Sequence, residues 1–174
     1  DTNIEALAKL KPVFWEQGTL TAGNAPGVND GAAVLLIMSA DKAKELGLKP
    51  LAKIVSHASI GQDVPYLATT PALATEKALK KAGLEAKDLE LMEINEAFAS
   101  VALKSMRMLG IPEEKVNVNG GAIALGHPIG ASGARILLTL AMEMKKRGAK
   151  LGAAAICSGT AQGDAVILSR EGLE

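Results

Sequence analysis

Three short segments contain the side chains most able to do chemistry: residues 95–99, the glycine-rich run 119–133 around His127, and residues 157–163. Each is predicted to lie where a strand ends or a helix begins, which is where open α/β sheets usually bind ligands. The sequence has one cysteine, Cys157, and two histidines. A Cys–His pair for nucleophilic or acid–base chemistry is therefore possible.

Each segment also has an ordinary structural explanation. Asn95 could be only the N-cap of a helix, with Glu96 as a first-turn charge that suits the helix dipole. A lone cysteine at the end of a strand is more often a small core residue than a catalyst, although the small residues after Cys157 leave its sulfur accessible. Five glycines surround His127. A plain connector is a weaker explanation there, because glycine costs conformational entropy and usually permits close backbone approach.

The glycine-rich run does not match the known phosphate-binding loops. It lacks the Gly-Lys-Ser/Thr ending of a P-loop, and Pro128 interrupts the dinucleotide spacing Gly-x-Gly-x-x-Gly. We therefore do not expect nucleotide binding through this loop.

Four other conspicuous side chains are not expected to take part in the chemistry. His57 is expected to be structural or to lie at the surface, and Arg135 to be a helix-end charge that suits the dipole. Phe14 and Trp15 are expected to anchor the N-terminal segment.

Composition narrows the class of protein. The 174 residues, 48% of them hydrophobic, indicate one globular domain or one domain plus a remnant. Nineteen basic and nineteen acidic residues cancel, so nucleic acid or an anionic membrane surface has no electrostatic support as a partner. No apolar stretch is long enough to span a bilayer. A single cysteine fits a reducing compartment, with the cytoplasm as the default, and the start at Asp1 suggests a fragment or a processed chain.

The elements that must position these residues alternate between strands and helices. This order predicts an α/β fold with a mixed five-stranded sheet and helices on both faces, whose last two strands form a tight antiparallel pair. Lys49 and Pro50 mark a joint between two units. Strands are predicted at 32–38, 51–56, 89–94, 153–157 and 165–169, and helices at 42–46, 71–82, 96–109 and 131–147.

Together these segments resemble the thiolase family. Asn-Glu-Ala-Phe-Ala stands at 95–99, and the block Gly-Gly-Ala-Ile-Ala-Leu-Gly-His-Pro-Ile-Gly-Ala-Ser-Gly-Ala-Arg stands at 120–135. A cysteine followed by a glycine-containing turn is at 157–163, and Thr-Ala-Gly-Asn-x-x-Gly-x-Asn-Asp-Gly-Ala-Ala spans 21–33. The blocks occur in the family's order, and the resemblance covers essentially the whole chain.

The resemblance implies a layered fold built from two similar α/β halves, with the active site between them. Residues 1–48 would be the end of the loop region plus the last strand and helix of the N-terminal half, and residues 49–174 the C-terminal domain. The cysteine that accepts the acyl group belongs to the missing N-terminal half. This chain alone is therefore expected to be inactive, with that half as a partner and a homodimer or tetramer as the assembly.

The resemblance also assigns roles, in an acyl-CoA C-acyltransferase that performs Claisen condensation or thiolysis of 3-ketoacyl-CoA. His127 would hold the thiolate of the missing cysteine, and Cys157 would be the acid/base. Asn95, through a positioned water, would stabilise an enolate-like oxyanion together with His127, and the Gly159 N–H would serve a second oxyanion hole. Coenzyme A and acyl-CoA would be substrates, with no metal and no tightly bound cofactor. The residues expected to line the pantetheine tunnel are Ala22, Pro26, Ala97 and Phe98.

Two departures leave an alternative open. Pro26 stands where the family often has a serine that can hydrogen-bond pantetheine, and Thr160 and Ala161 replace glycines in the turn after Cys157. A non-catalytic acyl-CoA-binding or assembly subunit of thiolase fold is the alternative. A ketoacyl synthase is less favoured, because those enzymes usually have histidine at the position of Cys157.

Overall fold

The computed structural model describes residues 2–173 and confirms the α/β class. Its strands are β1 (Lys53–Gly61), β2 (Leu91–Ile94), β3 (Leu151–Ser158) and β4 (Gln162–Ser169). Its α-helices are α1 (Ile4–Leu7), α2 (Ala40–Glu45), α3 (Thr70–Ala82), α4 (Ala99–Leu109), α5 (Ala122–Leu125) and α6 (Ser132–Arg147). Short 3-10 helices are η1 (Val64–Thr69), η2 (Ala86–Asp88) and η3 (Glu113–Lys115). No helix among these residues is long and apolar enough to cross a membrane.

The sheet has four strands in the order β1-β4-β3-β2. Strands β3 and β4, joined by a tight turn, pair antiparallel as predicted. Strand β1 pairs antiparallel with β4, and β2 pairs parallel with β3. The sheet is therefore mixed. Its parallel pair is joined by the long excursion through α4, α5 and α6, as a parallel connection requires.

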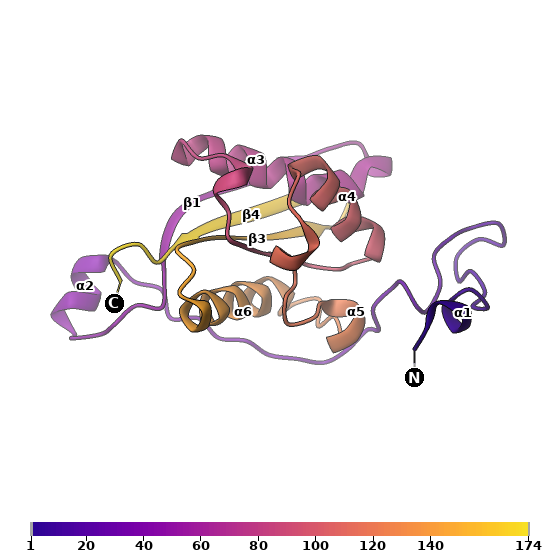
Figure 1. The fold of residues 1–174 in the computed structure, drawn as a ribbon, viewed down its shortest axis with the longest axis horizontal. Coiled ribbons are helices and arrows are strands. Elements are labelled where there is room, and N and C mark those ends of the chain that lie inside the picture. Colours follow the sequence, from indigo (N-terminus) through magenta and orange to yellow (C-terminus); the bar gives the residue numbers. More distant parts are fainter. Residues whose placement is uncertain (1, 174) are drawn as a thin grey trace.

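The predicted fifth strand is wrong. Residues 32–38 form no strand, and Val34 and Leu36 are 84% and 80% exposed. A continuous apolar run becomes a buried strand only when neighbouring strands supply hydrogen-bond partners. None of β1 to β4 pairs with this run, which crosses beneath the domain as an open segment (Figure 1).

Helices cover both faces of the sheet, as predicted. Helices α3 and α4 lie on one face and α6 on the other (Figure 1). Because side chains alternate along β3, Ala153, Ala155 and Cys157 pack towards the α3/α4 side while Ala154 packs towards α6. Small side chains on this central strand let both helical layers approach closely.

Local sequence signals placed most helix boundaries within one or two residues. Helix α3 has Pro71 in its first turn and ends at Gly83, and α6 ends at Gly148, as predicted. Helix α4 begins three residues later than predicted, because Phe98 is extended and Asn95 and Glu96 are not helical.

The two N-terminal aromatic residues only partly act as anchors. The Phe14 ring meets the edge of the Phe98 ring, with centroids 6.2 Å apart, but it is 71% exposed. Trp15 is 67% exposed, so the expectation that it is an anchor is wrong. Much of its apolar surface is uncovered in the described chain.

The close contact between α3 and β4 at Gly163 gives a stability test. We expect Gly163→Ala to lower the free energy of unfolding by about 1–3 kcal/mol, because its Cβ would overlap the Thr70 carbonyl and push α3 away from β4. Gly61→Ala is the matched control, since a Cβ there meets nothing within 4 Å. Urea denaturation followed by circular dichroism measures both. Equal stability of the two variants would contradict this close packing.

Candidate active site

The parallel pairing of β2 with β3 brings two predicted site residues to one edge of the sheet. Ile94 pairs with Ala155, and the Asn95 N–H donates to the Ala155 carbonyl at 2.9 Å. Asn95 therefore leaves β2 at the level where β3 reaches Cys157. The carboxyl ends of neighbouring parallel strands are the usual ligand edge of an α/β sheet.

Cys157 lies near the end of β3 and is 7% exposed. Burial raises the pKa of its thiol, because a thiolate is poorly solvated there, so the group is a protonated thiol at neutral pH. The tight turn that follows contains Gly159 at φ 45° and Ala161 at φ 60°. Ala161 is buried and Thr160 is exposed, so the methyl group of Ala161 packs inwards while Thr160 faces solvent.

Asn95 is completely buried, and neither its Oδ1 nor its Nδ2 has a hydrogen-bond partner among residues 2–173. The interpretation of Asn95 as an ordinary N-cap is wrong: Phe98 occupies the N-cap position of α4, with no side-chain cap. A buried amide without a partner carries a desolvation cost and needs an explanation. A binding role for this side chain supplies one.

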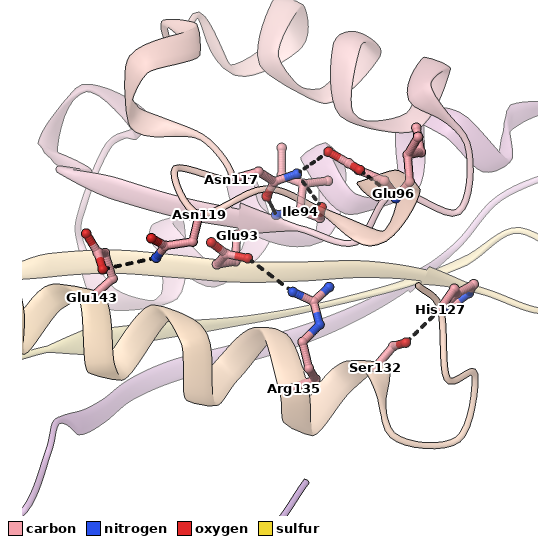
Figure 2. Close-up of polar contacts among 10 residues, drawn as sticks. Glu93, Ile94, Glu96, Asn117, Asn119, His127, Ser132, Arg135 and Glu143 are labelled. Atoms are coloured by element: carbon pink, nitrogen blue, oxygen red, sulfur yellow. Dashed lines mark hydrogen bonds and ion pairs between the residues drawn. The ribbon is translucent and has the colours of Figure 1, made fainter. Parts of the chain in front are cut away.

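Glu96 organises the glycine-rich loop instead of acting as a first-turn helix charge. Its carboxylate accepts hydrogen bonds from Asn117 Nδ2 at 2.9 Å and from the Ile123 N–H at 3.0 Å (Figure 2). A side chain at Gly121 would overlap this carboxylate. The glycine is therefore required for Glu96 to reach the loop that leads to His127.

His127 is half-buried between α5 and α6, and a hydrogen-bond chain fixes its ring. Its Nδ1 lies 2.7 Å from Ser132 Oγ, and the same hydroxyl donates to the Pro128 carbonyl at 2.9 Å (Figure 2). Because the single hydroxyl proton points to Pro128, the imidazole must donate from Nδ1. The neutral ring then carries its lone pair on Nε2. Burial and, to a smaller extent, the charge of Arg135 lower the pKa of His127, which favours this neutral form.

The segment around residues 21–31 joins the other two loops. The Asn29 side chain accepts from the His127 N–H at 3.1 Å, and Val28 forms a parallel bridge with His127. The Ala99 N–H donates to the Asn24 carbonyl at 2.9 Å. One segment therefore contacts both the histidine loop and the start of α4.

These contacts place the four predicted tunnel residues on two connected segments. Ala22 is exposed and Pro26 half-buried on the first, and Ala97 and Phe98 are half-buried on the second. The bond between Ala99 and Asn24 links the two segments. Their contact with pantetheine stays a prediction.

Several residues of the site were missed from the sequence or given another role. Ser132 lies within the 120–135 block, but nothing in its spacing showed that it would bind the histidine ring. Arg135, expected to be a helix-end charge, lies in the first turn of α6 and pairs with buried Glu93. His57 is exposed on β1, as expected for a surface residue. Among residues 2–173, no three histidine, cysteine or acidic side chains gather as metal ligands would.

The hydrogen-bond chain of His127 gives a spectroscopic test. In Ser132→Ala we expect the neutral ring to lose its fixed tautomer, because Nδ1–H no longer has its acceptor. Ring ¹⁵N chemical shifts should then move from protonated Nδ1 towards protonated Nε2. Ser105→Ala is the control, since Ser105 is equally buried and its hydroxyl has no hydrogen-bond partner in the described chain. A ring already protonated at Nε2 before substitution would refute the assignment.

The chain matches known proteins in sequence over almost its whole length. Residues 48–170 match the family model described as the thiolase C-terminal domain, and residues 1–41 match the thiolase N-terminal domain. An acetyl-CoA acetyltransferase of Chromobacterium violaceum is 55% identical over 170 residues, and one of Pseudomonas aeruginosa is 56% identical over 170 residues. Each match covers 98% of this chain but 43% of the relative, so the chain spans less than half the length of these relatives.

Solved structures agree with the sequence match. A crystal structure of the Bacillus anthracis acetyl-CoA acetyltransferase has a TM-score of 0.93 at 48% identity, and human mitochondrial 3-ketoacyl-CoA thiolase in complex with CoA has 0.88 at 44%. Each covers 97% of this chain and 43% of the solved chain. By sequence, by the order of its motifs and by its fold, this chain belongs to the thiolase family.

Proposed function

We propose that the chain is the C-terminal half of an acyl-CoA C-acyltransferase that condenses acyl-CoA or cleaves 3-ketoacyl-CoA. The observation that carries this proposal is Asn95, a completely buried amide without a partner in the described chain, at the strand end beside Cys157. A scaffold protein has no use for a buried amide with this desolvation cost. An enzyme can use such an amide to bind a polar oxygen or a water at this point.

Cys157 is proposed as the acid/base. In thiolysis, a thiolate from the N-terminal half attacks the 3-keto carbon, the C2–C3 bond breaks, and the Cys157 thiol protonates C2. The Cys157 thiolate then takes the proton of the incoming CoA thiol, which attacks the acyl-enzyme. Burial of the thiol suits the first step, because it keeps the proton on sulfur until a stronger base, the C2 carbanion, forms.

His127 is proposed to receive the proton of the acyl-accepting cysteine and to hold its thiolate. A neutral ring with its lone pair on Nε2 can accept that proton, and the resulting imidazolium stabilises the thiolate. Asn95, through a positioned water, and His127 then stabilise the enolate-like oxyanion. The Gly159 N–H is proposed as one donor of the second oxyanion hole, for which its place in the turn after Cys157 is suited.

The substrate side of the proposal rests on the two connected segments. Ala22, Pro26, Ala97 and Phe98 are proposed to line the pantetheine path of coenzyme A, with no metal or tightly bound cofactor. One relative of the same fold has been solved with CoA. Residues 1–48 are proposed to complete the N-terminal half and residues 49–174 to form the C-terminal domain. A homodimer or tetramer acting in the cytoplasm completes the proposal.

Thiolysis of acetoacetyl-CoA by free CoA tests the function. The chain supplied with the N-terminal half of a thiolase relative should turn over, and Cys157→Ala should lower the rate at least about 100-fold, because general acid–base catalysis is lost. Lys104→Ala, an exposed change on α4, is the control and should retain activity. Loss of substrate absorbance measures all three.

No turnover after the N-terminal half is supplied, combined with measurable CoA binding, would support the alternative of a non-catalytic acyl-CoA-binding subunit. Turnover that survives Cys157→Ala would reject the assigned acid/base. A chain that neither reacts nor binds CoA would refute both functions.

The proline in the substrate segment gives a separate affinity test. We expect Pro26→Ser to bind CoA about 2- to 10-fold more tightly, because a hydroxyl there can make one hydrogen bond to pantetheine worth about 0.5–1.5 kcal/mol. Ala32→Ser adds the same hydroxyl to an exposed position further along the segment and should leave affinity unchanged. Isothermal titration calorimetry with CoA measures the difference. Equal affinities would remove Pro26 from the pantetheine path.

A further inference from the structure

A buried ion pair joins β2 to α6 beside the site. Arg135 Nη1 lies 3.6 Å from Glu93 Oε2, and the Glu93 and Arg135 side chains are 3% and 19% exposed (Figure 2). Within residues 2–173, neither the three guanidinium nitrogens nor Glu93 Oε2 makes a hydrogen bond. The contact is thus an ion pair without the paired hydrogen bonds that usually offset burial of an arginine.

The ion pair lies close in sequence to two residues of the site. Glu93 is two residues before Asn95 on β2, and Arg135 is one helical turn after Ser132, whose hydroxyl binds His127. The pair therefore connects the strand that delivers Asn95 to the helix turn that orients His127. Figure 2 shows Arg135 directed from α6 towards Glu93.

The charges around the pair leave Arg135 only partly neutralised. The pKa of Glu93 is raised to about 7, chiefly by burial, which outweighs the lowering effect of Arg135; the charges of Glu96 and Glu143 contribute less to the rise. The Glu93 carboxyl is therefore partly protonated near neutral pH and only partly neutralises Arg135. The positive charge of Arg135 then acts on the imidazole as a like charge that disfavours protonation.

We propose that Arg135, half-buried against Glu93, is a positioning residue of the site whose positive charge adds to burial in disfavouring protonation of His127, while Ser132 sets the tautomer of its ring. Glu93 compensates the charge of Arg135 only in part, because burial of its own carboxyl group disfavours the ionised form. A buried ion pair is by itself weak support for stability. A role in setting the protonation of His127 explains its place better. The value of that neutral base for catalysis rests on the proposed function, but the electrostatic effect itself does not.

The test is an NMR titration of the two histidines in the full chain. His57, exposed on β1 at the opposite edge of the sheet from β2, is an internal reference. Arg135→Met should raise the pKa of His127, because the like charge is gone, and Arg135→Lys should keep it close to the original value. Glu93→Gln should leave it unchanged or lower it. Arg107→Met, an exposed change on α4, is the matched control.

These directions separate an electrostatic role from a merely structural one. Loosened packing would hydrate the imidazole and raise the pKa of His127 in both Arg135→Met and Glu93→Gln, which would overturn the proposal. No change in Arg135→Met would also overturn it. If Arg135→Met does not fold, a raised pKa in Glu93→Gln or in Arg135→Lys still refutes the role.

Thiolysis measured in parallel separates this inference from the proposed function. With the N-terminal half supplied, the acid limb of the pH–rate profile should move to higher pH in Arg135→Met and stay in place in Arg135→Lys. If the pKa of His127 shifts as expected but no thiolysis occurs, the electrostatic role of Arg135 is supported and the proposed activity is refuted. If thiolysis occurs but the pKa does not shift, the activity is supported and the role of Arg135 is refuted.

Discussion

The parallel pairing of β2 with β3 is the constraint on which the site depends. It places Asn95 beside the end of β3, where Cys157 lies, although the two are far apart in sequence. Small side chains along β3 make the pairing compatible with helices on both faces. A shift of one residue in this register would turn the Cys157 side chain to the other face. Backbone hydrogen bonds inside the sheet therefore fix the position of Cys157 relative to Asn95.

Polar side chains hold the loops around this edge by bonding to backbone amides. Glu96 binds the Ile123 N–H, and Asn29 binds the His127 N–H. Ser132 then fixes the ring of His127. The contacts of Glu96 and Asn29 cross between segments, so the loops are positioned by one another and not only by their own secondary structure. This arrangement fixes the position and tautomer of the His127 ring and leaves the Nε2 lone pair for the proton acceptance proposed above.

The sequence predicted what depends on local patterns and motifs. Helix ends at Gly83 and Gly148, the mixed α/β class and the tight β3–β4 pair all follow from short-range signals. The strand at 32–38 failed because strand formation needs partners that a local pattern cannot supply. Glu96 and Arg135 were misjudged for the same reason, since their partners lie far away in sequence. The roles of Cys157, His127, Asn95 and Gly159 stay predictions.

The exposed run at 32–38 has a consequence for how such a chain is made. It is seven residues of Ala, Val, Leu, Ile and Met without a charge or proline, the composition that stacks into intermolecular cross-β structure. If strands of the proposed N-terminal half pair with it, association between copies competes with productive folding until that pairing forms. A complementary half would therefore protect this half from aggregation during synthesis, in addition to completing its chemistry.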